Sequence, residues 1–173
     1  MKLLVDAGPW LAVPPRGYGG LENVVATLVG ELRGRGHTVV LASVGDSDLP
    51  VDELVCRYPT GQFARLAQPY AEVVGVAVAH AQTTVDTVHR HAVAGAPFDL
   101  VHTHLEVVGP ALLAALGPTA PPVLHTLHWD PARNADFYAG FDGGGRVFFV
   151  GVSEAQLAGA PERLRRQCLA PVP

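Results

Sequence analysis

The chain has 173 residues, of which 49% are hydrophobic and 16% charged, and its formal net charge is −4. This length most simply makes one domain with a substantial core, the composition excludes a disordered chain, and the negative charge without a basic stripe argues against nucleic acid as a partner. The two cysteines, Cys56 and Cys168, lie far apart in the sequence, which favours a reduced protein. The sequence shows neither a signal-peptide pattern nor an apolar run of membrane length, so we expect a cytoplasmic protein.

The first 42 residues predict a strand, a glycine turn, a helix and a second strand. Apolar residues 2–5 and 38–42 predict the two strands. The helix between them is predicted from apolar residues at helical spacing, which are Leu21, Val24, Val25, Leu28 and Leu32. A strand, turn, helix and strand in this order open a parallel α/β sheet.

The glycine turn before the first helix is a candidate anion site. Gly19 and Gly20 lie where the helix begins, and N–H groups at a helix N-terminus favour an anion. The dinucleotide fingerprint fails, because Glu22 stands where its third glycine belongs, and no Gly-Lys-Ser/Thr follows as in a phosphate-binding Walker loop. The turn therefore indicates an anion or substrate site of another α/β family, unless the two glycines only make a tight turn.

The remaining elements alternate between helix and strand. We expect a short strand near residues 54–58, helices over 70–93 and 108–116, strands over 98–104, 123–128 and 146–152, a loop or short helix over 129–145, and a helix from Ser153 to Leu164. This alternation predicts an α/β fold, a Rossmann-like open parallel sheet with helices on both faces.

Polar residues follow three of the predicted strands at their carboxyl ends. His104 and Glu106 follow one strand, His128 and Asp130 follow the next, and Ser153 follows the last. The ligand crevice of an open parallel sheet lies along that edge, so these residues are candidates for one site. Each has a simpler interpretation as well, and Ser153 in particular is a good helix N-cap.

Four histidines in this region could be read as a metal site. His102 and His125 lie within strands, where a satisfied core residue is the more common role, and His104 and His128 lie at strand ends. The set lacks a cysteine or a clear carboxylate ligand, so we expect no metal.

Three arginines near the C-terminus, Arg163, Arg165 and Arg166, fit a solvated helix end or a contact with phosphates of a partner or lipid, which leaves membrane contact open.

The motifs, taken in order, resemble the N-terminal half of glycosyltransferase family 4, the retaining sugar transferases of GT-B fold. The matching segments are PPRGYGGLENVV, ELRGRGHTVVLAS, FDLVHTHLE, VLHTLH and VGVSEAQ. The Tyr-Gly-Gly-x-Glu turn and the Gly-His after the first helix are the most specific of them. Residues 46–97 match only loosely. The resemblance covers nearly all of the chain and implies one half of a GT-B fold.

The resemblance implies a division of labour between two domains. The N-terminal domain, here residues 1–173, binds mainly the acceptor, and a C-terminal domain, absent here, holds the nucleotide-diphosphate sugar without a metal or other cofactor. The implied enzyme is a bacterial-type hexosyltransferase, and this chain alone would be inactive. The candidate residues are His128 as the catalytic contact to the donor sugar, Gly19, Gly20, His104, Glu106, Asp130 and Ser153 around the diphosphate or substrate, and Arg16 and Tyr18 in the acceptor loop.

Two other functions remain open on the sequence. The same sheet could belong to a sugar-nucleotide epimerase or a nucleotide-binding oxidoreductase, although the glycine pattern argues against a dinucleotide. It could also be a binding module without chemistry.

We further expect the isolated chain to associate with itself through exposed aromatic residues at the ligand edge, namely Trp10, Tyr18, Trp129 and Phe137.

Overall fold

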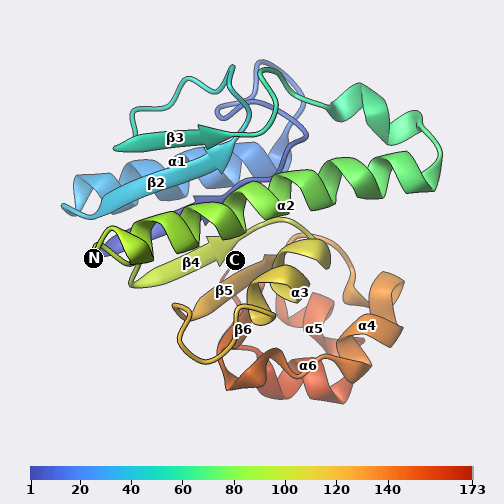
Figure 1. The fold of residues 1–173 in the computed structure, drawn as a ribbon. Helices are drawn as coiled ribbons and strands as arrows, with labels where there is room; N and C mark the ends of the chain where they lie inside the picture. The colour runs from blue at the N-terminus through green and yellow to red at the C-terminus, as the bar shows by residue number, and fades with distance from the viewer. Residues whose placement is uncertain (173) are drawn as a thin grey trace.

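The structure, a computed structural model that describes residues 1–172, is built on a six-stranded parallel sheet (Figure 1). Its strands are β1 (Lys2–Asp6), β2 (Thr38–Ser43), β3 (Glu53–Cys56), β4 (Leu100–Thr103), β5 (Val123–Leu127) and β6 (Val147–Gly151). Their spatial order is β3-β2-β1-β4-β5-β6, with every neighbouring pair parallel. The predicted Rossmann-like open sheet is thus confirmed, and the strand order reverses between β1 and β4.

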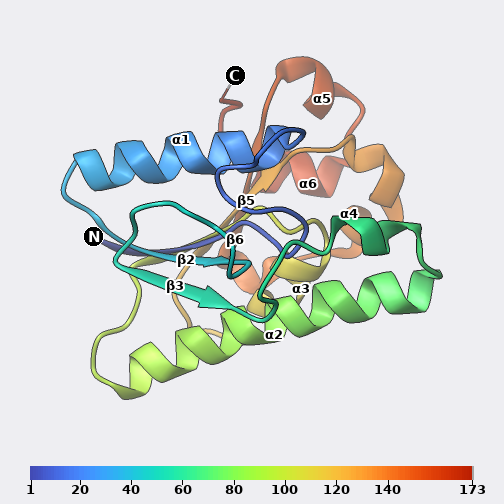
Figure 2. The same ribbon diagram turned by 90° about the horizontal axis from the view of Figure 1, so that it is seen from above.

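Helices cover both faces of this sheet, as Figure 2 shows. Helix α1 (Gly20–Gly34) lies over one face, and α2 (Tyr70–Val93) and α3 (Val108–Ala114) lie over the other. The shorter elements are η1 (Phe63–Ala67), η2 (Pro131–Asn134), α4 (Ala135–Gly140), η3 (Gly143–Gly145), α5 (Glu154–Ala158) and α6 (Glu162–Gln167).

The strands are apolar on both sides because both of their faces are covered. Val5 of β1 packs in a cluster with Val25 and Val29 of α1. Its neighbour Leu4 points to the other face and packs in a cluster with Val88 of α2. Successive side chains of a strand point to opposite faces, so the continuous apolar run of β1 serves two cores.

A buried polar cluster ties α2 to the carboxyl end of β1. His80 Nε2 of α2 lies 2.7 Å from Asp6 Oδ1, Thr103 Oγ1 donates to Asp6 Oδ2 at 2.8 Å, and Gly8 N–H donates to Asp6 Oδ1 at 3.0 Å. Burial alone would raise the pKa of Asp6, but the His80 charge and these hydrogen bonds outweigh it and lower that pKa. The cluster fixes the ends of β1 and β4 and the start of the loop after β1. His80 is a polar residue of an otherwise largely apolar helix face, and it is buried.

The helix expected from Ser153 to Leu164 is wrong in its extent. Helix α5 ends at Ala158, Gly159 caps it, and α6 begins after Pro161. Proline disfavours helical geometry in the residue before it and has no N–H to continue the ladder, so the chain turns here. The expected loop or short helix over 129–145 contains η2, α4 and η3.

Among residues 1–172, no helix is both long enough and apolar enough to cross a membrane.

Candidate functional site

A cleft of about 650 Å³ opens at the carboxyl edge of the sheet, where the strand order reverses between β1 and β4. Such a reversal is where open α/β sheets bind ligands. Its walls come from the loop after β1, the first turn of α1, η1 and the segments that follow β4 and β5. The lining residues are Ala7, Gly8, Trp10, Leu11, Tyr18, Gly20, Leu21, Glu22, Val24, Phe63, Leu66, His104, Leu105, Glu106, His128 and Trp129.

Two predicted site residues, His104 and His128, meet in this cleft. His104 Nδ1 and His128 Nε2 are 2.8 Å apart, and the His104 ring stacks on His102 with 4.4 Å between centroids. Burial, followed by the neighbouring histidines, holds the pKa of His104 well below its usual value. Burial and His125 lower the pKa of His128 to about 4, although Glu106 opposes this shift. Both rings are therefore neutral near pH 7, so one nitrogen of the pair donates its proton and the other accepts.

Glu106, the third predicted residue at this edge, is held by Tyr138 and lies near the buried ring of His125. The hydroxyl of Tyr138 in α4 donates to Glu106 Oε1. His125 Nε2 lies 3.7 Å from Glu106 Oε2, while His125 Nδ1 donates to the backbone oxygen of Thr103 at 3.0 Å. Burial, then the Glu106 charge and its hydrogen bond, raise the pKa of Tyr138, so this hydroxyl keeps its proton. Glu106 lines the cleft with Oε1 held by Tyr138, while its Oε2 is buried without a hydrogen-bond partner.

Tyr138 and His125 support the site but were not among the predicted site residues. His125 lies inside β5, and its position was interpreted as that of a satisfied core residue. Tyr138 lies in a segment whose sequence predicts only a loop or short helix. No spacing in the sequence links Tyr138 to Glu106, because the contact depends on how α4 packs against the sheet.

The glycine turn begins α1 as predicted, but a carboxylate already lies beside it. The first ladder bond runs from Asn23 N–H to Gly19 O at 3.0 Å, so the N–H groups of Gly20, Leu21 and Glu22 precede the ladder. Glu22 is buried and lines the cleft. Burial raises the pKa of Glu22, and a hydrogen bond from its own backbone N–H opposes that shift. The turn thus places both helix-terminal N–H groups and an acidic side chain at the cleft.

Other predicted residues fall outside the cleft lining. Asp130 accepts from Ala132 N–H at 2.9 Å and caps η2, and Ser153 accepts from Gln156 N–H at 3.1 Å and caps α5. Gly19 is the buried N-cap of α1 and is not in the lining, and Arg16 is exposed and outside it.

Three of the four aromatic residues expected at this edge do line the cleft. Trp10, Tyr18 and Trp129 are lining residues, and the Tyr18 ring lies 5.7 Å from that of Phe63 in η1. The expectation for Phe137 was wrong. Its ring packs against the core beside Phe141, with 4.8 Å between centroids, because α4 turns this residue inward.

The four histidines do not form a metal site in the described chain. His102 Nε2 pairs with Thr126 Oγ1 at 2.8 Å, and the contacts described above engage one nitrogen each of His104, His125 and His128. Within residues 1–172, no group of three or more histidine, cysteine or acidic side chains is arranged to hold a metal ion.

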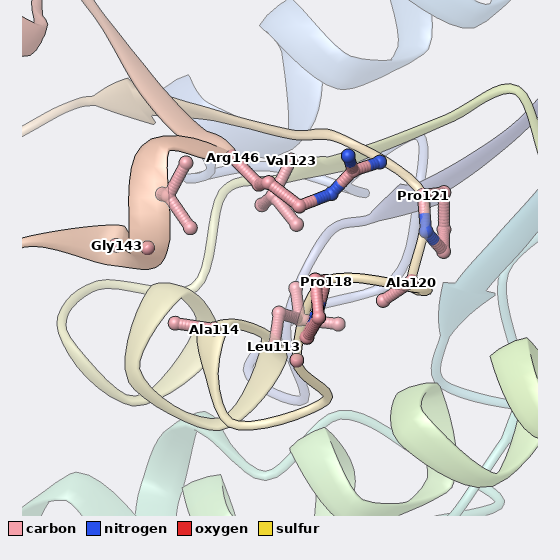
Figure 3. A pocket seen from close by; sticks show the side chains of 11 residues that line it. Leu113, Ala114, Pro118, Ala120, Pro121, Val123, Gly143 and Arg146 are labelled. Carbon is pink, nitrogen blue, oxygen red and sulfur yellow. The ribbon is translucent and has the colours of Figure 1, made fainter.

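A second, much smaller cavity of about 100 Å³ lies at the opposite, amino edge of the sheet (Figure 3). It is enclosed by Leu113 and Ala114 of α3, by Pro118 and by the glycines of η3, and the Arg146 side chain extends along it. It lies before the first residues of β5 and β6, at the far end from the histidines. This cavity is therefore separate from the candidate site.

Comparisons with known proteins agree with this geometry. The model of Glycosyltransferase Family 4 matches residues 18–155. A solved structure with a similar fold is that of AviGT4, described as a glycosyltransferase involved in Avilamycin A biosynthesis, with a TM-score of 0.50 and 20% sequence identity. The alignment covers 92% of this chain and 40% of AviGT4. A search of curated proteins gave no match. Since the family model spans most of its length, the chain belongs to glycosyltransferase family 4.

Proposed function

We propose that this chain is the acceptor-side domain of a retaining glycosyltransferase, which transfers a hexosyl group from a nucleotide-diphosphate sugar to an acceptor hydroxyl. A second α/β domain would hold the nucleotide. The observation that carries the proposal is the meeting, in one cleft of a family 4 domain, of the α1 N-terminus with the His104–His128 pair. The 40% coverage of AviGT4 is consistent with a further domain.

The chemistry needs negative charge to be stabilised on the leaving diphosphate. In this proposal the N–H groups at the start of α1, next to Gly19 and Gly20, face that diphosphate. Fixed N–H dipoles stabilise developing charge without having to reorganise during the reaction. Glu22 lies beside them and would have to move aside or take up a proton when the diphosphate arrives, which its raised pKa favours.

The sugar and the acceptor hydroxyl would meet near the histidine pair. His128 is neutral and held by His104, so it can exchange a hydrogen bond with a sugar hydroxyl. Glu106 lines the cleft with Oε1 held by Tyr138, and in this proposal its carboxylate accepts a hydrogen bond from the attacking hydroxyl. Closure of a second domain over the cleft would exclude water and hold the two reactants in contact.

The test is sugar transfer by this chain combined with a donor-binding domain, fused to it or supplied in trans. The measurements are release of nucleoside diphosphate from a set of nucleotide sugars and the anomeric configuration of the product by NMR. We expect release that depends on acceptor and product of retained configuration, with the chain alone inactive. Product of inverted configuration would contradict the retaining assignment, and lack of any release would contradict the function.

A further inference from the structure

The candidate cleft has an apolar rim and no lysine or arginine in its lining, and from this we infer the acceptor class. We propose that the acceptor is an uncharged molecule that carries its hydroxyl on an aromatic or other largely apolar skeleton. This inference rests on the proposed function, because it assumes that the cleft holds an acceptor. It extends that function from an unspecified hydroxyl to a class of molecule.

The rim is formed by large apolar side chains that remain exposed. Tyr18 is 76% exposed, Trp129 50%, and Phe63 and Leu66 44% each. They line one cleft although they come from three separate parts of the chain, the loop before α1, η1 and the segment after β5. A concave apolar surface of this kind gains free energy when an apolar ligand covers it.

The charges of the cleft disfavour an anionic acceptor. Of the described residues that line it, two are ionisable acids, Glu22 and Glu106, and none is lysine or arginine. Arg133 lies with its guanidinium 5.9 Å from the Trp129 ring centroid but is not a lining residue, and neither is Arg16. Away from the start of α1, which the donor diphosphate would occupy, a phosphate or carboxylate on the acceptor would lose water without gaining a cationic partner, and the Glu106 carboxylate would repel it.

The depth of the cleft separates its polar and apolar groups. His104 and Leu105 are buried, and Glu106 and His128 are only partly exposed, whereas the rim side chains are open to solvent. An acceptor that placed its hydroxyl on Glu106 and the histidine pair would lay the rest of its skeleton against Tyr18 and Phe63. This arrangement orients the acceptor by its polar end and binds it by its apolar body.

Both tryptophans of the chain, Trp10 and Trp129, line the cleft, so their two indole N–H signals report binding there. We would titrate the ¹⁵N-labelled chain with 2-naphthol, which is uncharged at neutral pH, with 2-naphthyl phosphate, which has the same skeleton, and with myo-inositol, which is neutral but polar. We expect 2-naphthol to shift both signals and to bind at least about tenfold more tightly than the other two. Equal or tighter binding of the phosphate or of inositol, or no binding of 2-naphthol, would overturn the proposal.

Matched variants locate the binding on the rim. Tyr18→Ala should weaken 2-naphthol binding by about tenfold, while Tyr70→Ala, which removes a similarly exposed tyrosine outside the cleft, should leave it unchanged. Leu66→Arg should reverse the preference toward 2-naphthyl phosphate by adding the missing cation. If the tyrosine variants behave alike, or Leu66→Arg does not favour the phosphate, the assignment to this rim is wrong.

The other occupant of an exposed apolar rim would be a second copy of the chain. Analytical ultracentrifugation of the wild type and the Tyr18→Ala variant separates the two cases. A dimer that Tyr18→Ala dissociates and that excludes 2-naphthol would assign the rim to self-association and overturn the acceptor proposal. The binding test does not use sugar transfer, so 2-naphthol binding without transfer would contradict only the proposed function. Transfer to a phosphorylated acceptor would contradict only the acceptor class.

Discussion

His104 and His128 hold each other in place through a 2.8 Å hydrogen bond between Nδ1 of the first ring and Nε2 of the second. The two residues follow neighbouring parallel strands, β4 and β5, so the sheet brings them together. The bond requires that one of these two nitrogens donates a proton and the other accepts, and it leaves Nδ1 of His128 for another partner. A ring held in this way is suited to orient a sugar hydroxyl.

The first prediction concerns His128 in an active two-domain enzyme. His128→Ala should lower kcat about ten- to a thousandfold without a matching rise in KM, because we expect this ring to contact the donor sugar more strongly in the transition state than in the ground state. Steady-state kinetics with the nucleotide sugar as the varied substrate measures this. An increase in KM alone would mean that His128 only helps the donor to bind.

His102→Ala is the control for this variant. His102 is buried, pairs with Thr126 and stacks on His104, so its loss should lower the free energy of unfolding. The turnover of the folded fraction should change much less than in His128→Ala. Equal activity per folded molecule in both variants would remove His128 from the site.

The second prediction is a loss of stability in mild acid. Burial lowers the pKa of both His102 and His128 to about 4, from the ordinary 6.5. Below about pH 6.5 the unfolded chain takes up protons that the folded chain cannot, so the free energy of unfolding should fall as the pH falls toward 4. The slope should be about 1.4 kcal/mol per pH unit for each of these histidines. Urea unfolding between about pH 7 and about pH 5 measures it.

Asp6 does not contribute to this window. Its folded pKa is lowered below the ordinary 3.8, so the stability that Asp6 provides is present above that value and is lost only as the pH falls through the lowered pKa. His102→Gln should therefore reduce the slope between pH 6.5 and 5 by about 1.4 kcal/mol per pH unit. A stability that is constant from pH 7 to 5 would contradict the neutral state of these histidines.

The third prediction concerns Tyr138, which acts through Glu106. Tyr138→Phe keeps the ring that packs edge-on against Phe149 and removes only the hydroxyl that donates to Glu106. The freed carboxylate can then rotate, so kcat in the two-domain enzyme should fall about tenfold while KM for the nucleotide sugar stays nearly constant. Phe137→Leu, an aromatic loss in the same helix without a contact to Glu106, is the control. A similar kcat for Tyr138→Phe and wild type would show that Tyr138 is purely structural.

The sequence predicted the parts of the fold that local patterns determine. The helical spacing from Leu21 to Leu32 and the apolar strand runs give the parallel sheet, and the carboxyl ends of the strands locate His104, Glu106 and His128 at one edge. The structure brings these three residues together in the cleft because neighbouring parallel strands end side by side.

The rest depends on contacts between distant segments. Asp130 and Ser153 follow strands as the histidines do, yet their side chains turn back to cap the next helical turn. Spacing cannot distinguish a cap from a ligand, because both put a short polar side chain after a strand. The burial of His80 likewise has no local signal in the sequence, since its partner Asp6 lies 74 residues away in the chain.

The last prediction separates the two glycines of the turn. A Cβ on Gly19, whose φ is +154°, would lie 2.6 Å from Pro15 Cβ, whereas a Cβ on Gly20 meets nothing within 4 Å. Gly19→Ala should therefore shift the start of α1 and cost about 1–3 kcal/mol of stability. Gly20→Ala, at the first helical position, should be neutral or slightly stabilising. Thermal unfolding of both variants measures the difference. Equal melting temperatures would show that the close approach to Pro15 relaxes at no cost, and that the first glycine is not required for the turn.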